Sequence, residues 1–264
     1  MAEKEEKNIH ILTKKIGETP LECVWRYKKE YPEFVNIPMT YAGRLDPMAE
    51  GILLVLSGDA IKEKEKYLNF RKTYEFEILW ECATDTGDIL GVVSSDDLSI
   101  FPKVSDVEEY VKNSTEKFEQ VYPAYSSQPA EGPSLEGGII SKPLIQWSRE
   151  GRISEVKIPS HEVEIFDTEY ISRRFENGKD LLQKITSNIS LVKGDFRQEK
   201  ILAEWKKILG PHPDREYAID IVRLDVSGGF YVRQFVIDLA KKFDTKALTY
   251  HILRTVVGEY TVDK

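Results

Sequence analysis

One aspartate stands where a carboxylate could do chemistry. Asp46 lies in a loop between Gly43 and Pro47, and these two residues keep the loop out of regular structure. An ionised carboxylate on such a loop can act as a nucleophile or as a general base. An aspartate in this setting is also a common turn former, whose carboxylate accepts backbone N–H bonds. The residue type alone leaves both interpretations of Asp46 open.

The sequence around Asp46 is more specific than the aspartate itself. It reads YAGRLDPMAEGIL over residues 41–53 and resembles the catalytic motif of pseudouridine synthases, in particular the tRNA pseudouridine(55) synthase family called TruB. Further segments are similar to that family in the same order: KKIGET (14–19), KTYEF (72–76), TDTGDILG (84–91), QVYPAYSS (120–127), VSGGFYVR (226–233) and HILR (251–254). One short match arises easily by chance, whereas several in the correct order and spacing do not.

The resemblance implies an enzyme, an RNA pseudouridine synthase, which breaks the N1–C1′ bond of uridine, turns the uracil and rejoins it through C5. Because a stacked base is out of reach, such an enzyme must first flip the nucleotide out of the RNA. Asp46 would be the catalytic carboxylate, and Arg233 the cation that keeps it charged. Tyr74 matches the tyrosine that relatives stack on the target uracil, and its hydroxyl could help remove the C5 proton.

The same resemblance supplies five candidate substrate-binding residues. Lys14 and Tyr231 lie in the first matching segment and in the segment that carries Arg233, while Leu253 matches a residue that lines the pocket in relatives. Tyr41 stands where bacterial relatives have a histidine that is inserted into the RNA loop, and an aromatic ring can stack on bases there. Arg44 replaces a small residue and gives a string similar to that of synthases that modify ribosomal RNA.

The favoured function is therefore conversion of the T-loop uridine at tRNA position 55, with tRNA as the partner. Tyr41 and Arg44 keep another tRNA, rRNA or mRNA uridine open as the target. A mainly non-catalytic RNA-binding folding chaperone is a further alternative. We expect no cofactor and no metal, because two cysteines and four scattered histidines give no metal-ligand spacing.

Composition limits the class of protein. A length of 264 residues with 41% hydrophobic residues suits one domain over residues 1–264. The net charge of -8 argues against a protein that coats nucleic acid, so a basic patch must be local, for example around Lys14-Lys15, Arg71-Lys72 or Lys241-Lys242. The longest apolar stretch, around Ile52 to Leu56, is too short to cross a bilayer. We expect a soluble, cytoplasmic monomer.

Periodicity predicts the elements that position these residues. Strands are expected at 72–80, with Tyr74, Phe76 and Ile78 on one face, and at 218–226. Thr19 and Pro20 begin a helix, and further helices are expected at 105–118, 143–151, 180–191, 195–209 and 230–243, with loops at 40–47 and 123–141. The pattern and the resemblance imply an α+β protein with the pseudouridine synthase catalytic fold, a mixed, largely antiparallel sheet with flanking helices and loops.

Two segments are candidates for special roles. Residues 125–151 match the loop and helix that form an RNA-binding thumb in relatives, and residues 175–216 form a helical insertion where short family members have only a turn. The insertion could supply RNA contacts or cover the sheet. Because the sequence ends just after a strand expected at 259–262, we expect no C-terminal PUA domain, so RNA contacts would come from the catalytic domain.

Overall fold

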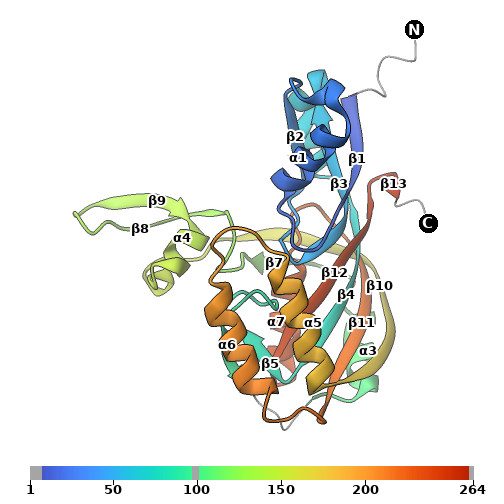
Figure 1. Cartoon of the computed structure of the whole chain (residues 1–264), viewed down its shortest axis with the longest axis vertical. Coiled ribbons are helices and arrows are strands. Elements are labelled where there is room, and N and C mark those ends of the chain that lie inside the picture. Colours follow the sequence, from blue (N-terminus) through green and yellow to red (C-terminus); the bar gives the residue numbers. More distant parts are fainter. Residues whose placement is uncertain (1–7, 97–100, 262–264) are drawn as a thin grey trace.

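A long mixed sheet forms the centre of the protein (Figure 1). The computed structural model describes residues 8–96 and 101–261, so both ends of the predicted 1–264 domain, and Val262 of the expected final strand, lie outside the described residues. The strands of the central sheet are β1 (Ile9–Lys14), β2 (Met39–Ala42), β3 (Ala49–Ser57), β4 (Lys72–Trp80), β7 (Lys117–Val121), β10 (Ser160–Asn177), β11 (Glu216–Val226), β12 (Ala247–Val257) and β13 (Tyr260–Thr261).

The strand order is β1-β3-β12-β4-β11-β10-β7, with β2 beside β3 and β13 beside β12. Within the described part of this sheet, β12 and β3 pair in parallel and the other neighbours pair antiparallel. The predicted α+β fold with a mixed, largely antiparallel sheet is therefore confirmed. Two small hairpins lie outside this sheet, β5 (Cys82–Thr84) with β6 (Val93–Asp96), and β8 (Pro129–Pro133) with β9 (Ile139–Pro143).

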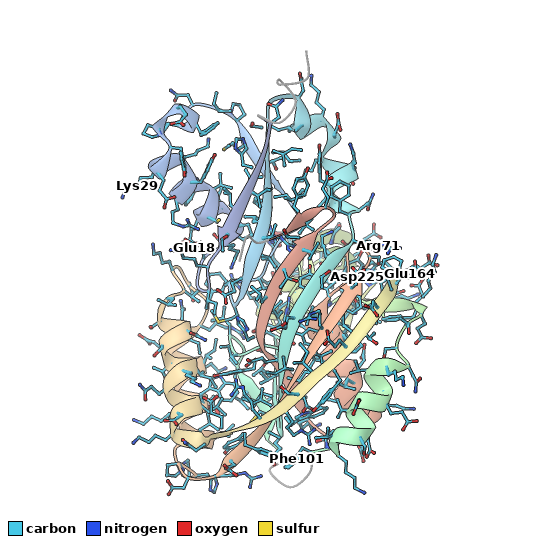
Figure 2. The ribbon with its side chains drawn as sticks, turned by 90° about the vertical axis from the view of Figure 1, so that its right-hand side faces the viewer. Glu18, Lys29, Arg71, Phe101, Glu164 and Asp225 are labelled. Atoms are coloured by element: carbon cyan, nitrogen blue, oxygen red, sulfur yellow. The ribbon has the colours of Figure 1, made fainter. Side chains whose placement is uncertain are left out.

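Helices flank the sheet on both sides, as Figures 1 and 2 show. They are α1 (Pro20–Glu30), α2 (Lys64–Leu68), α3 (Val104–Lys112), α4 (Leu144–Arg149), α5 (Gly178–Ser190), α6 (Gln198–Leu209) and α7 (Val232–Lys242), with short 3₁₀ turns at Pro32–Phe34, Gly58–Glu63 and Ile153–Glu155. None of the helices in the described ranges is long and apolar enough to span a membrane.

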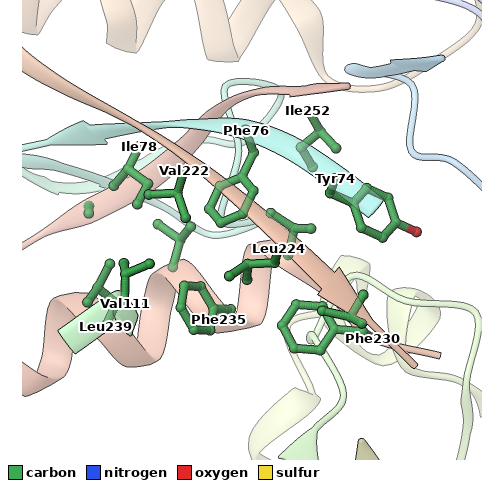
Figure 3. Packing of buried hydrophobic residues seen from close by; sticks show 14 of the residues in the cluster. Tyr74, Phe76, Ile78, Val111, Val222, Leu224, Phe230, Phe235, Leu239 and Ile252 are labelled. Carbon is green, nitrogen blue, oxygen red and sulfur yellow. The ribbon is translucent and has the colours of Figure 1, made fainter. Parts of the chain in front are cut away.

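The predicted strand β4 has the expected bounds and burial. Its alternating apolar side chains face α7, and Phe76 meets Phe235 edge to face with ring centroids 6.1 Å apart (Figure 3). Such alternation buries one face of a strand and leaves the other half exposed. Tyr74 lies at the end of this packed face, close to Phe230 and the start of α7 (Figure 3). The core therefore brings the start of β4 and the start of α7 together.

The start of α1 confirms the predicted cap. The Thr19 side chain accepts a hydrogen bond from the Glu22 backbone N–H, and the Glu22 carboxylate accepts one from the Thr19 N–H. This reciprocal capping box, with Pro20 in the first turn, fixes where the helix begins.

Three local predictions differ from the structure. The helix expected at 105–118 ends at Lys112, where the Ser114 hydroxyl donates to the Tyr110 carbonyl, and Phe118 belongs to β7. Residues 40–42 of the expected loop pair with the edge of β3 as β2. The expected loop at 123–141 contains the β8–β9 hairpin: Gly137 and Gly138, with φ of 95° and 86°, form its turn, while Gly132 pairs with Ile140 within the ladder.

The two helices expected in the 175–216 insertion are present as α5 and α6. Their buried apolar faces pack on the side of the sheet opposite α7, together with Leu79 of β4, Ile219 of β11 and Leu248 of β12. Trp205 of α6 is fully buried, and its Nε1 donates to the Ile89 carbonyl at 3.1 Å. The α5–α6 pair therefore covers an apolar face of the sheet that would otherwise meet water.

We predict that Trp205→Ala lowers the free energy of unfolding by about 3–5 kcal/mol, because it leaves a large cavity between α6 and the sheet and an unpaired carbonyl. Ile139→Ala, at an exposed position of the β8–β9 hairpin, should change it by less than about 0.5 kcal/mol. Urea unfolding curves measure both. A loss below about 1 kcal/mol for Trp205→Ala would show that the two helices do not stabilise the sheet.

Candidate active site

A cavity of about 1070 Å³ lies where the loop between β2 and β3, the start of β4 and the start of α7 meet. This volume is at the upper end of the usual range for ligand sites. Six predicted site residues line it: Tyr41, Arg44, Asp46, Tyr74, Tyr231 and Arg233. Lys14 and Leu253 do not.

Asp46 and Arg233 form the central ion pair of this cavity. Arg233 Nε donates to Asp46 Oδ2 at 2.7 Å, although the two residues are 187 positions apart in the sequence. The arginine side chain is 3% exposed, whereas that of Asp46 is 30% exposed. The second oxygen, Oδ1, accepts no hydrogen bond from the described residues. The pair therefore presents a charged oxygen to the cavity while burying its cation.

Two backbone carbonyls fix the arginine from the other side. Arg233 Nη1 donates to the Thr86 carbonyl at 2.5 Å, and Nη2 donates to the Tyr125 carbonyl at 3.2 Å. A planar guanidinium with all three nitrogens engaged cannot rotate without breaking a hydrogen bond. The direction of its Nε, and with it the position of the Asp46 carboxylate, is therefore set by the Thr86 and Tyr125 backbone.

Lys14 holds the aspartate loop and does not line the cavity. It is fully buried, and its Nζ donates to the carbonyls of Lys15, Pro47 and Ala49. Burial lowers the pKa of Lys14 to about 8. The structure therefore places the ammonium of Lys14, which was expected to bind substrate, among backbone carbonyls and away from the cavity wall.

Leu253 is also displaced from its predicted place. In β12, Ile252 pairs with Phe76 and Arg254 with Tyr74, so Ile252 and Arg254 line the cavity and Leu253 lies on the other face. Since side chains alternate along a strand, a shift of one residue moves a side chain to the opposite side of the sheet. Ile252 supplies the apolar wall expected of Leu253.

The two tyrosines are held by neighbouring elements. Tyr74 is 6% exposed and reaches the cavity from the end of β4. The Tyr231 backbone exchanges two hydrogen bonds with the Gln120 side chain of β7, at 2.8 and 3.1 Å. Burial, with a smaller contribution from the Asp46 charge, raises the pKa of Tyr231 to about 12, so its phenol stays protonated.

Sequence reasoning did not assign a role to a second carboxylate, Asp88. Its Oδ2 lies 3.8 Å from Arg233 Nε, and its Oδ1 accepts hydrogen bonds from the Thr86 hydroxyl and the Leu90 N–H. Burial raises the pKa of Asp88 to about 6, against the opposing effect of the Arg233 charge. The TDTGD string was the available signal, because it places this acid beside Thr86.

Two basic residues, Arg44 and Lys72, lie on the cavity wall. Lys72 is buried there, and its Nζ donates to the Leu68 and Phe70 carbonyls at 2.8 and 2.7 Å. Burial lowers the pKa of Lys72 to about 7. Arg44 donates to the Tyr41 hydroxyl at 3.3 Å. Within the described ranges, no group of three or more His, Cys, Asp or Glu could hold a metal ion.

Curated relatives are similar to this chain over most of its length. tRNA pseudouridine synthase 4 of Saccharomyces cerevisiae is 23% identical, covering 90% of this chain and 65% of that protein, and that of Schizosaccharomyces pombe is 24% identical, covering 90% and 69%. tRNA pseudouridine synthase B of Bacillus licheniformis is 26% identical, covering 96% and 66%. This chain thus spans about two thirds of the length of these relatives.

Solved structures share the fold at lower identity. A chain in a crystal structure of a Cbf5–Nop10–Gar1 complex superposes with a TM-score of 0.53 at 14% identity, covering 97% of this chain and 50% of that chain. A chain in an H/ACA RNP bound to a substrate RNA containing 2′-deoxyuridine gives 0.53 at 13%, covering 97% and 49%.

The family assignment rests on a match that includes the aspartate loop. Residues 36–196, more than half of the chain, match the family model of the N-terminal domain of TruB family pseudouridylate synthases. The chain therefore belongs to the TruB family of pseudouridylate synthases.

Proposed function

We propose that this protein isomerises uridine to pseudouridine in tRNA, with the T-loop uridine at position 55 as the target. The observation that carries the proposal is the Asp46 carboxylate, which Arg233 holds on the cavity wall with Oδ1 open to a substrate. Family membership and the names of the curated relatives support the reaction class and the tRNA substrate.

The reaction exchanges one bond for another and conserves all atoms. The N1–C1′ bond breaks, the uracil turns, the C5–C1′ bond forms, and a proton leaves C5 while N1 gains one. Asp46 would assist the bond cleavage, either by adding to the sugar or the base or by removing a ribose proton to give a glycal. Each route requires an ionised carboxylate, and the fixed guanidinium of Arg233 stabilises that charge.

The other residues of the cavity have supporting roles in this proposal. Tyr74 would stack on the flipped uracil, and its hydroxyl would help to remove the C5 proton. Ile252 gives an apolar wall that keeps water from the cleaved intermediate. Tyr41 and Arg44 would contact the RNA loop around the vacated position. Tyr231 would complete the substrate pocket beside Asp46.

The segment 125–151 would act as the RNA-gripping thumb. Its helix α4 packs with the β8–β9 hairpin in a small core of its own, formed by Ala130, Leu144, Trp147 and Val156. Figure 1 shows that this unit projects from the side of the molecule. Ile145 and Arg149 of α4 line the cavity, so the thumb would close on an RNA whose target base lies between it and the sheet.

We predict that Asp46→Asn abolishes modification, with a loss of at least about 10²–10⁴-fold in the single-turnover rate, because the amide cannot act as a nucleophile or a base. Affinity for tRNA should change little, since phosphate contacts come from lysines and arginines. Modification mapping on tRNA transcripts, with filter binding, measures both and identifies the target uridine. The matched control is Asp59→Asn, an exposed aspartate that pairs with Lys62 on the surface. A wild-type protein that binds tRNA and modifies no uridine would end the proposal.

Arg233→Ala and Arg233→Lys should each reduce the single-turnover rate far more than the affinity for tRNA, because the partner of Arg233 is a carboxylate and not a phosphate. The lysine variant keeps the positive charge but lacks the planar guanidinium, which donates to two carbonyls and to Asp46 at the same time. It should therefore be little more active than Arg233→Ala. Thermal unfolding of each variant verifies that it is folded. Equal losses of rate and affinity would contradict the role given to Arg233.

We expect the rate to fall as the pH drops through about 6, because protonation of Asp88 removes the second negative partner of Arg233. Asp88→Asn should show the low rate already at pH 7, and its rate should not fall further as the pH drops through about 6.

Stability should respond in the opposite direction. Because the pKa of Asp88 is raised in the folded protein, the folded state binds more protons than the unfolded state between about pH 6 and 4, so the contribution of Asp88 to stability becomes more favourable on acidification. Rate profiles and the difference in unfolding free energy between wild type and variant check both signs. If the rate of the variant still falls as the pH drops through about 6, another group causes that fall.

A further inference from the structure

The connection between α5 and α6 reaches the cavity. The two helices could cover the sheet without this contact. Residues 191–197 join the two helices, and Phe196 and Arg197 at the end of this connection line the cavity wall. Because short family members were expected to have only a turn here, this wall is contributed by the insertion itself. The contacts of Arg197 show what it does there.

Arg197 clamps two residues that belong to different segments. Its Nη1 and Nη2 donate to the two carboxylate oxygens of Asp85 at 2.6 and 3.2 Å, and Nη1 also donates to the Tyr125 hydroxyl at 2.9 Å. The Tyr125 hydroxyl donates to Asp85 at 2.9 Å and closes a triangle of three side chains. A bidentate contact between a guanidinium and a carboxylate fixes the orientation of the carboxylate as well as its distance.

The clamped residues directly position the carbonyls that hold Arg233. Tyr125 supplies one of these carbonyls from its own backbone, and Thr86, which supplies the other, follows Asp85 in the sequence. Asp85 is tied to its loop a second time, because its backbone and its carboxylate both bond to Val92. A displacement of Asp85 or Tyr125 therefore moves an acceptor of Arg233, and with it the Nε that faces Asp46.

The backbone of Arg197 is held in an unusual conformation that aims this side chain. Its φ and ψ are 65° and 28°, in the left-handed region that residues with a Cβ seldom occupy. The Asp195 carboxylate accepts a hydrogen bond from the Arg197 N–H, and the Gln198 side chain bonds to Phe196 and Gly194. These local bonds maintain the turn that directs the guanidinium toward Asp85.

The other end of the connection touches Gly17, a neighbour of the aspartate loop. A Cβ added to Gly17 would lie 2.4 Å from Leu191 Cβ, so the two segments pack so closely that only glycine fits at position 17. The Gly17 N–H donates to the Pro47 carbonyl at 2.8 Å, next to Asp46. The insertion thus touches the supports of both members of the Asp46–Arg233 pair.

We propose that Arg197 is a positioning residue for the reaction, acting through Asp85 and Tyr125 on Arg233 and so on Asp46; this rests on the proposed function. The Arg197 and Asp85 side chains are each 29% exposed, so solvent screens part of their attraction. The effect of Arg197 is therefore on the geometry of the catalytic pair, where a misplacement of about 1 Å can lower a rate by about 10²-fold.

The test compares Arg197→Ala, Arg197→Lys and the matched control Lys200→Ala, which removes an exposed positive charge from the same insertion. Arg197→Ala should lower the single-turnover rate about 10- to 100-fold, with tRNA affinity and thermal midpoint close to those of the control. Arg197→Lys should recover only part of the rate, because an ammonium cannot make the bidentate contact with the Asp85 carboxylate. A second readout is solvent exchange of the Arg233 Nε–H by NMR, which should be at least about tenfold faster in Arg197→Ala once the guanidinium is released.

The outcomes separate this inference from the proposed function. A rate and an Nε–H exchange equal to those of Lys200→Ala overturn the positioning role. A loss of tRNA affinity as large as the loss of rate also overturns it, because Arg197 would then contact the RNA itself. If the wild-type protein forms no pseudouridine, the proposed function fails, and the Nε–H exchange still decides whether Arg197 positions Arg233.

Discussion

The ion pair between Asp46 and Arg233 joins two segments that are 187 positions apart, and the rest of the architecture serves to make that contact possible. The Asp46 loop precedes β3, Arg233 lies in the first turn of α7, and the core between the sheet and α7 sets their separation. Burying a guanidinium is unfavourable unless each of its nitrogens finds an acceptor. The Thr86 and Tyr125 carbonyls meet that requirement, so the segments that supply them are as necessary to the site as its charged residues.

Much of the fold and part of the site could be predicted from the sequence, because those features depend on local patterns. The alternation in β4 gave its bounds and its buried face, and the string around Asp46 identified the aspartate that meets Arg233 in the cavity. Tyr74 and Tyr231 also reach the cavity, as their matching segments indicated.

The remaining features depend on contacts that no local pattern contains. Leu253 and Ile252 are adjacent and similar, and only the register of β12 against β4 decides which of them faces the cavity. Lys14 carries a charge that could bind phosphate, yet the fold brings backbone carbonyls around its ammonium, and these accept its hydrogen bonds instead. Arg197 meets Asp85 across 112 positions, a contact that depends on the fold, so local periodicity could not indicate it.

The double use of α5 and α6 restricts how this lineage can change. The apolar faces of the two helices cover the sheet, while their connection reaches residues that support the Asp46–Arg233 pair. A deletion that replaced the segment with a short turn would expose Leu79, Ile219 and Leu248 to water at the same time as it removed Arg197. Loss of the segment would thus expose apolar surface and release the Arg197 contacts together, so neither can be lost without the other.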